Sequence, residues 1–227
     1  MANEGDVRAD WPGYTEEVRV GASNYQLDPT RFPDAAAIKA NSRLGRLKAS
    51  LASGDLDGDG DFDEIHAYGG RSFSIRTADG ALVWDSGSQF ETKIKELVPT
   101  AFNISNDNNT FDDRSDDKGP EPEGLTLGKV AGRTYAFVGL ERIGGVMVYD
   151  ITIPANPTFV TFANNRNYSA KPIGLSNGDV DPNGAGDLGP EGLVFISEEN
   201  SPNGNPLLVI ANEISGTTTV YEITGGE

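Results

Sequence analysis

The chain has 227 residues, and its 35 acidic and 18 basic side chains give a formal net charge of -17 at pH 7. This charge argues against nucleic acid and anionic membranes as partners, because both attract basic surfaces. The sequence has no cysteine and a single histidine, His66. Disulfides and thiolate nucleophiles are therefore excluded, and histidine-based triads are disfavoured. No apolar run approaches the length that spans a bilayer, so we expect no membrane insertion.

The fold class follows from the turn-forming residues. The chain contains 28 glycines and 13 prolines, and short apolar runs alternate with clusters of Gly, Asn, Asp and Pro. Such runs read as strands separated by turns. We therefore expect an all-β protein that is large enough to bury a hydrophobic core without disulfides.

In chain order, residues 1–46 are expected to form an N-terminal segment in which 17–20 could add an outer strand. Residues 47–224 are expected to form β-propeller blades. A helix is predicted at 91–98, because Phe90, Ile94 and Leu97 fall on one face and Pro99 ends it. The predicted blades, with long acidic loops between them, are 47–87, 124–164 and 192–224.

The second and third predicted blades repeat each other in sequence. Residues 122–125 and 190–193 both read PEGL, at an offset of 68, whereas VYDIT at 148–152 matches VYEIT at 220–224 at an offset of 72. Repeated sets of short strands are typical of propellers, which usually need four to eight blades to close. We predict about three four-stranded antiparallel blades, completed by further blades or by another chain. The alternative is a β-sandwich with similar hairpins.

A run of alternating aspartates, DLDGDGDFDE at 55–64, gives the strongest chemical signal. Carboxylates at positions 1, 3 and 5, a glycine at 6 and oxygen donors at 7 and 9 suit a calcium loop. Mg²⁺ is disfavoured because it seldom uses so many protein carboxylates. The alternative is a solvated acidic turn. The expected cofactor is therefore Ca²⁺, and its candidate ligands are Asp55, Asp57, Asp59, Asp61 and Asp63.

The aspartate loop lacks the helices and the final glutamate of an EF-hand, since position 12 is His66. With strands predicted on either side, it instead resembles the calcium loop of FG-GAP-type propeller repeats. That resemblance implies a loop bridging two strands of one blade. It also implies that Asp61 contributes its backbone carbonyl, whereas Asp55, Asp57, Asp59 and Asp63 contribute carboxylates.

A second acidic site is predicted from the repeats. Glu123 and Glu191 begin the innermost strands of their blades, and Glu141 and Glu213 end the second strands. Blades oriented alike would gather these carboxylates at one mouth of a channel, where they could bind a divalent cation or a metal-bridged anion. The alternative is that Glu-Gly only forms a turn between blades. The candidate residues are Asp117, Glu121, Glu123, Glu141, Arg142, Glu191 and Glu213.

Five segments, at 67–75, 114–124, 139–142, 189–193 and 212–217, resemble the choice-of-anchor I family. Members of that family are secreted or surface-attached propeller proteins, and some are regarded as atypical alkaline phosphatases. The resemblance implies export, with the signal and the anchor outside this sequence. It also implies additional blades, because family members are generally longer.

We therefore expect a calcium-binding extracellular propeller module, acting as a binding or structural part of a larger secreted or surface-attached protein. The alternative is a metal-dependent phosphoesterase, alkaline-phosphatase-like or esterase-like, that uses the acidic channel mouth. Arg114, Lys118 and Arg142 would then bind the phosphate. No catalytic residue can be assigned, because no Ser or Thr stands in a recognised nucleophile context. Whether the chain is an enzyme therefore stays open.

Overall fold

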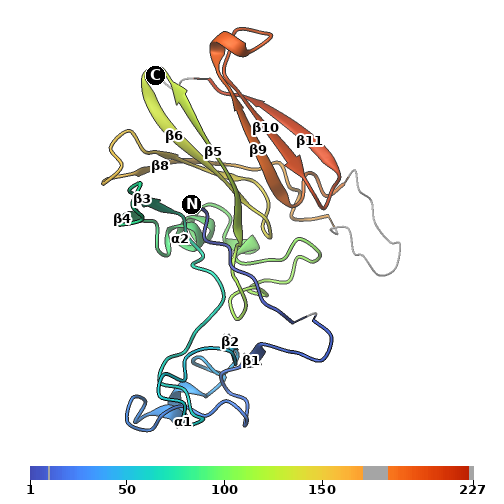
Figure 1. Cartoon of the computed structure of the whole chain (residues 1–227). Coiled ribbons are helices and arrows are strands. Elements are labelled where there is room, and N and C mark those ends of the chain that lie inside the picture. Colours follow the sequence, from blue (N-terminus) through green and yellow to red (C-terminus); the bar gives the residue numbers. More distant parts are fainter. Residues whose placement is uncertain (10, 171–183, 225–227) are drawn as a thin grey trace. The chain divides into compact units, whose positions relative to one another are not determined.

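Strands dominate the computed structural model of the chain, which describes residues 1–9, 11–170 and 184–224 (Figure 1). Its helices are short, namely α1 (Ala35–Ile38) and α2 (Gln89–Leu97), with 3-10 turns η1 (Pro99–Ala101) and η2 (Glu198–Asn200). The sheets are antiparallel. The all-β prediction is confirmed, and no sheet within the described residues closes into a ring.

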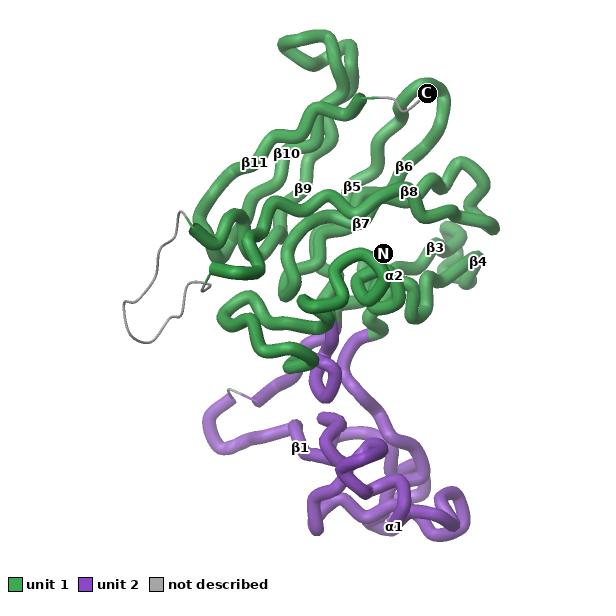
Figure 2. The backbone as a smooth tube through the Cα atoms, turned by 180° about the vertical axis from the view of Figure 1, so that it is seen from behind, with its two compact units in different colours: residues 1–4, 70–113, 120–227 green, residues 5–69, 114–119 purple. Residues whose placement is uncertain are grey.

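The chain divides into two compact units, drawn in different colours in Figure 2. Unit 1 comprises residues 1–4, 70–113 and 120–227, and unit 2 comprises residues 5–69 and 114–119. Unit 2 therefore continues past the domain boundary expected between residues 46 and 47. Part of the acidic loop that precedes the third predicted blade, at 171–183, lies outside the described residues.

A four-stranded meander in unit 1 coincides with the second predicted blade. It runs in the order β5 (Pro122–Val130), β6 (Arg133–Leu140), β7 (Val146–Asp150) and β8 (Thr158–Ala163). The two-residue turn between β5 and β6 has φ of 48° at Ala131 and 82° at Gly132. Positive φ at both central residues is the geometry of the tight hairpin turn that matches strand twist.

A three-stranded sheet in unit 1 coincides with the third predicted blade, in the order β9 (Pro190–Ile196), β10 (Leu207–Asn212) and β11 (Thr217–Glu222). Its pairing repeats that of the four-stranded sheet. Leu125 pairs with Val138 in the first sheet, and Leu193 pairs with Ile210 in the second, at the offsets of 68 and 72 found in the sequence. The sequence repeat is therefore also a repeat of strand register.

The two repeated sheets pack against each other in unit 1. Their shared core contains Phe137, Val148, Leu208 and Ile210. The approach is close because β5 carries glycine there: a Cβ atom on Gly124 would lie 2.0 Å from the Glu191 carbonyl oxygen. Any side chain at this position would force the two sheets apart.

The first predicted blade, at 47–87, does not form as one sheet. Strand β2 (Lys48–Ser50) pairs with β1 (Glu17–Arg19) in unit 2, whereas β3 (Ser74–Arg76) pairs with β4 (Leu82–Asp85) in unit 1. Within residues 62–68 of this blade, β-pairing is limited to the isolated bridge between Phe62 and Leu27. The apolar residues of this stretch pack on the N-terminal segment instead of forming a ladder.

Helix α2 lies close to the predicted 91–98, and this prediction is confirmed. Its apolar face buries Phe90 and Ile94 in the main core of unit 1. Phe73 of the chain before β3 and Tyr149 of β7 belong to the same cluster, with their ring centroids 5.0 Å apart. The four-stranded sheet is thus covered on one face by this core and on the other by β9–β11.

Candidate metal-binding sites

Three of the five predicted aspartates converge in unit 2. One carboxylate oxygen from each of Asp55, Asp57 and Asp63 lies within 4.8 Å of the other two. Carboxylate oxygens this close repel one another unless a cation or hydrogen-bond donors separate them. The arrangement therefore provides three hard oxygen ligands of the kind that Ca²⁺ uses.

Backbone amides shape this aspartate loop. Gly58 and Gly60 have φ of 79° and 99°, and their amides donate to the two carboxylate oxygens of Asp55 over 2.7 and 3.1 Å. The Leu56 amide donates to Asp63 over 2.8 Å. These hydrogen bonds hold Asp55 and Asp63, the first and ninth residues of the motif, in one loop. The loop needs glycine at 58 and 60 because other residues adopt such positive φ angles only with strain.

Asp59 and Asp61 do not belong to the group of three converging carboxylates. The pKa of Asp61 is raised, first by partial desolvation and then by the charges of Asp59 and Asp28. Asp28 escaped the sequence reasoning because it lies 27 residues before the motif. The bridge between Leu27 and Phe62 brings it to the loop, and its amide donates to the Phe62 carbonyl over 3.1 Å.

Phe62 anchors the loop in unit 2. Its side chain is buried and stacks on Tyr25 with ring centroids 4.1 Å apart, between the partly buried Asp61 and Asp63 in sequence. The setting differs from the one that the FG-GAP resemblance implies. Strand β2 precedes the loop, but the next strand of the described chain is β3 in unit 1, and Phe62 inside the loop makes only an isolated bridge to Leu27.

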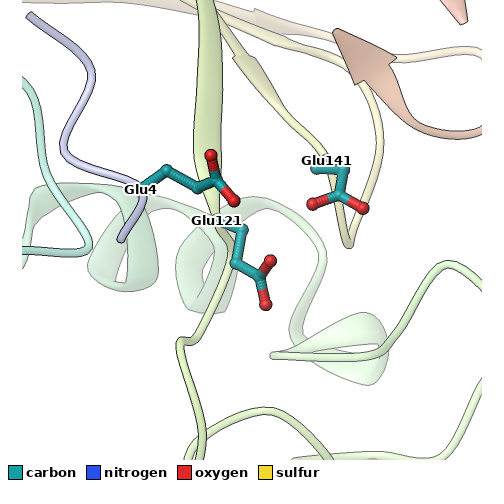
Figure 3. A group of neighbouring side chains, drawn as sticks. All are labelled: Glu4, Glu121 and Glu141. Carbon is teal, nitrogen blue, oxygen red and sulfur yellow. The ribbon is translucent and has the colours of Figure 1, made fainter. Parts of the chain in front are cut away.

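A second carboxylate cluster lies in unit 1, where Glu4, Glu121 and Glu141 converge from three segments (Figure 3). One oxygen of each lies within 4.8 Å of the others. Glu121 precedes β5 and is fully buried, and Glu141 follows β6 and is 7% exposed. Glu4 is placed by the N-terminal residues, which run beside the chain leading into β3, with the Gly70 amide donating to the Asn3 carbonyl.

Arg142 balances part of this charge. Its guanidinium lies 2.9 Å from Glu121 and 3.2 Å from Glu141. Asn106 links the pair, since its amide donates to Glu141 over 3.1 Å and its carbonyl accepts from Arg142 over 3.2 Å. Arg142 therefore neutralises part of the carboxylate charge of the cluster.

The other predicted glutamates act on the same cluster electrostatically. Burial, followed by the charges of Glu4, Glu191 and Glu213, raises the pKa of Glu123 to about 7. Burial also raises the pKa of Glu141 to about 8, and the neighbouring Glu121 adds to the rise although Arg142 opposes it. Glu121 and Glu141 of the predicted set thus converge, whereas Glu123, Glu191 and Glu213 are related to each other only through their charges. Glu4 was missed because nothing in its sequence context marks it.

Comparison of the two repeats shows that the sheet architecture does not require this cluster. The counterparts of Glu121 and Arg142 in the second repeat are Gly189 and Ile214, at offsets 68 and 72. Both residue 121 and residue 189 have left-handed backbone, with φ of 49° and 69°. A glutamate at such a position costs roughly 1 kcal/mol more than a glycine. Glu121 therefore occupies a position for which glycine suffices structurally.

Asp117 does not join the glutamates in unit 1. It belongs to unit 2, where its carboxylate lies 3.0 Å from Lys48 and 2.8 Å from Arg114. The basic residues considered for phosphate binding also have partners. Lys118 donates to the Gly5 carbonyl over 3.3 Å, and Arg142 pairs with the glutamates.

Comparisons with known proteins agree with the sequence resemblance. The model of the choice-of-anchor I domain matches residues 1–154. Gigasin-3a from Magallana gigas is 31% identical over 195 residues, which cover 83% of this chain and 68% of that protein. A mesenchyme-specific cell surface glycoprotein from Strongylocentrotus purpuratus is 30% identical over 167 residues, which cover 65% of this chain and 21% of that protein. No solved structure matches the chain.

The match thus spans 68% of the first relative and 21% of the second. None of the helices among the described residues has the length and apolar character needed to cross a membrane. The repeated PEGL segments, the paired sheets and the family match lead to the same assignment. The chain belongs to the choice-of-anchor I family.

Proposed function

We propose that the chain is an extracellular module that binds Ca²⁺ in its aspartate loop and contributes binding or structural surface to a larger secreted or surface-attached protein. The convergence of Asp55, Asp57 and Asp63 is the observation that carries the calcium proposal. The surface location is supported by the family and by a relative named as a cell surface glycoprotein.

The role proposed for Ca²⁺ is structural. The aspartate loop is built on glycine-dependent turns and is anchored by Phe62, so a bound ion would hold the remaining carboxylates against their mutual repulsion. An ion that binds only the folded state adds its binding free energy to the stability of that state. Without the ion, the excess negative charge would favour opening of the loop.

Isothermal titration with Ca²⁺ tests this proposal on the purified chain. Asp57→Asn removes a converging carboxylate and should weaken binding at least about tenfold, the change expected when a site loses one charged ligand. Asp61→Asn is the matched control in the same loop, since residue 61 would contribute its backbone carbonyl, and it should bind within about threefold of the original chain. No heat of binding, or equal losses in both variants, would contradict the proposal.

We propose further that the repeated sheets are neighbouring blades of a propeller completed by additional blades or by another chain. The identical register of β5–β7 and β9–β11 and the close approach of their first strands support this arrangement. The glutamate cluster would then lie beside the first strands of adjacent blades, where propellers open into a channel.

The glutamate cluster is proposed as a second cation site, because Glu121 replaces the glycine of the other repeat at a conformational cost. A titration that shows two classes of sites, one of them lost in Glu141→Gln, would support it. The phosphoesterase alternative has weaker support. Arg114, Lys118 and Arg142 already contact carboxylate or carbonyl oxygens, which leaves them less available to a phosphate.

A further inference from the structure

The sequence holds one histidine, and the structure joins it to a serine and a carboxylate in unit 2. The Oγ of Ser53 lies 2.9 Å from Nδ1 of His66, and Nε2 of the same ring lies 2.8 Å from Oε2 of Glu64. A hydroxyl, an imidazole and a carboxylate connected in this order are the three groups of a serine nucleophile with its base. Composition alone disfavours such a triad, but one histidine suffices for it.

The carboxylate determines how the imidazole ring can act. An ionised Glu64 only accepts hydrogen bonds, so its contact with Nε2 of His66 requires the ring proton on that nitrogen. In the neutral ring Nδ1 then carries the lone pair, which accepts the hydroxyl hydrogen of Ser53. The ring is used in the opposite sense to the common triad, where Nε2 faces the serine, but the three groups have the same roles.

Backbone contacts hold the two ends of the aspartate loop together and so fix this geometry. The Ser50 amide donates to the His66 carbonyl over 2.8 Å, and the Glu64 amide donates to the Gly54 carbonyl over 3.0 Å. Gly54 has φ of 111°, and a Cβ atom there would collide with the Glu64 carbonyl oxygen. Glycine therefore allows the close approach that places Ser53 beside His66.

The serine hydroxyl is accessible, and two hydrogen-bond donors lie next to it in the chain. Ser53 is exposed and the His66 side chain is 39% exposed, so a reactant can reach Oγ from solvent. Among the described residues, none accepts a hydrogen bond from the backbone amides of Ser53 and Gly54. Amides beside a nucleophile are the groups that stabilise the oxyanion formed when it attacks a carbonyl.

The charge near Ser53 selects between the reactions that such a nucleophile can perform. Asp55, Asp57 and Asp63 converge in the adjoining loop, and their carboxylates repel an anionic phosphoester. A neutral carboxylic ester meets no such repulsion. Because the site is open to solvent, an ester that projects from a larger molecule can also reach Oγ.

We propose that Ser53, His66 and Glu64 form a nucleophilic relay that hydrolyses carboxylic esters. Nδ1 of His66 takes the hydroxyl proton as Oγ of Ser53 bonds to the carbonyl carbon of the ester. The bond from that carbon to the alcohol oxygen then breaks, and the alcohol leaves with the proton. Water, deprotonated by the same nitrogen, attacks the acyl-serine, the carboxylic acid is released and Ser53 recovers its proton.

Covalent labelling of the full chain tests the nucleophile. A fluorophosphonate, which reacts with activated serines, should add one label per chain, and peptide mass spectrometry should locate the label at Ser53. His66→Gln removes the base and should slow labelling at least about tenfold. Ser42→Ala is the matched control, because Ser42 is also an exposed serine of unit 2, and this variant should be labelled as the original chain is.

Hydrolysis of p-nitrophenyl acetate measures turnover by the same three groups. Ser53→Ala, His66→Gln and Glu64→Gln should each lower kcat/KM at least about tenfold, with circular dichroism showing that the variants are folded. A hydrogen-bonded clamp that only shapes the loop would leave these rates unchanged.

Three outcomes would overturn the inference: no label at Ser53, labelling that His66→Gln does not slow, or hydrolysis that persists in Ser53→Ala. Isothermal titration of Ser53→Ala with Ca²⁺ separates the inference from the calcium proposal. Since Ser53 is not a candidate ligand, this variant should bind Ca²⁺ as the original chain does. Weaker binding would mean that the serine serves the aspartate loop instead.

Discussion

At the scale of single residues, the clearest feature is a charge pair that only one repeat carries. Glu121 and Arg142 stand where the other repeat has Gly189 and Ile214. Glu121 is fully buried in left-handed backbone and lies 2.9 Å from Arg142. A buried ion pair contributes little net stability, but removing one partner leaves an uncompensated charge.

The two residues of this pair can be replaced by their counterparts in the second repeat. Arg142→Ile alone should lower the free energy of unfolding by about 3 kcal/mol, because the buried Glu121 loses the guanidinium that lies 2.9 Å away. Adding Glu121→Gly should restore most of that loss, since it removes the buried charge and the left-handed strain together. Urea denaturation measures both, and a double variant no more stable than Arg142→Ile would contradict the prediction.

The raised carboxyl pKa values predict a pH dependence. Burial raises the pKa of Glu123 to about 7 and that of Glu141 to about 8, so the folded state binds protons that the unfolded chain releases at lower pH. The stability contributed by the protonated forms is complete below the unfolded pKa of about 4.5 and is lost as the pH rises through the folded values.

Thermal melting between pH 5 and 9, with a chelator present, tests whether stability falls as the pH rises. Because glutamine mimics the protonated carboxyl, Glu141→Gln should melt progressively higher than the original chain as the pH rises towards 9. The exposed Glu198→Gln serves as the control and should track the original chain at each pH. A difference that stays constant with pH for Glu141→Gln would show that its carboxyl is ionised throughout.

At the scale of elements, β5–β8, β9–β11 and α2 could be predicted because local patterns determine them. Strand alternation, the turn at Ala131 and Gly132 and the helical spacing of Phe90 and Ile94 all lie within a few residues of the element concerned. The first predicted blade does not form as one sheet, because its residues pair and pack with residues that are distant in sequence. Phe62 packs on Tyr25, which lies 37 residues earlier, and no local signal specifies that contact.

The packing of the repeated sheets leads to a prediction about two equivalent glycines. A Cβ on Gly124 would meet the Glu191 carbonyl oxygen at 2.0 Å, whereas a Cβ on Gly192 would meet only the Ala211 Cβ at 3.3 Å. Gly124→Ala should destabilise unit 1 by about 2 kcal/mol or more, as overpacking of cores does.

The matched variant Gly192→Ala should change the free energy of unfolding by less than about 1 kcal/mol, because its environment leaves more room. Both variants are compared by urea denaturation, with the slope of the transition showing whether the same surface is exposed. Equal destabilisation by the two alanines would mean that the sheets do not rely on close approach at β5.

At the scale of the whole molecule, the negative charge is distributed differently from what the sequence suggests. The acidic stretch at 107–123 looks unbalanced when only its neighbours are counted. In the structure Asp116 pairs with Arg19 and Arg46, and Asp117 pairs with Lys48, residues that lie about 70 to 97 positions away in sequence. Burial raises the pKa of Asp116, but the hydrogen bonds and charges of the two arginines outweigh it and lower the pKa overall.

The candidate sites were predictable to the extent that their residues are close in sequence or repeated. Asp55, Asp57 and Asp63 follow from one motif, and Glu123, Glu141, Glu191 and Glu213 follow from the repeat. Asp28 and Glu4 reach their sites through the chain paths of separate segments, which no spacing rule describes.

Calcium binding by the aspartate loop is the central claim, and hydrogen–deuterium exchange tests it most directly. Saturating Ca²⁺ should slow amide exchange in peptides covering residues 54–64 and 26–28, where amides of Gly58, Gly60 and Leu56 hold the carboxylates in place. Peptides from β5 and β6 belong to unit 1, whereas the aspartate loop belongs to unit 2, so they serve as the internal control, and Asp57→Asn should abolish the slowing. Unchanged exchange at 54–64 with saturating Ca²⁺ would contradict the claim.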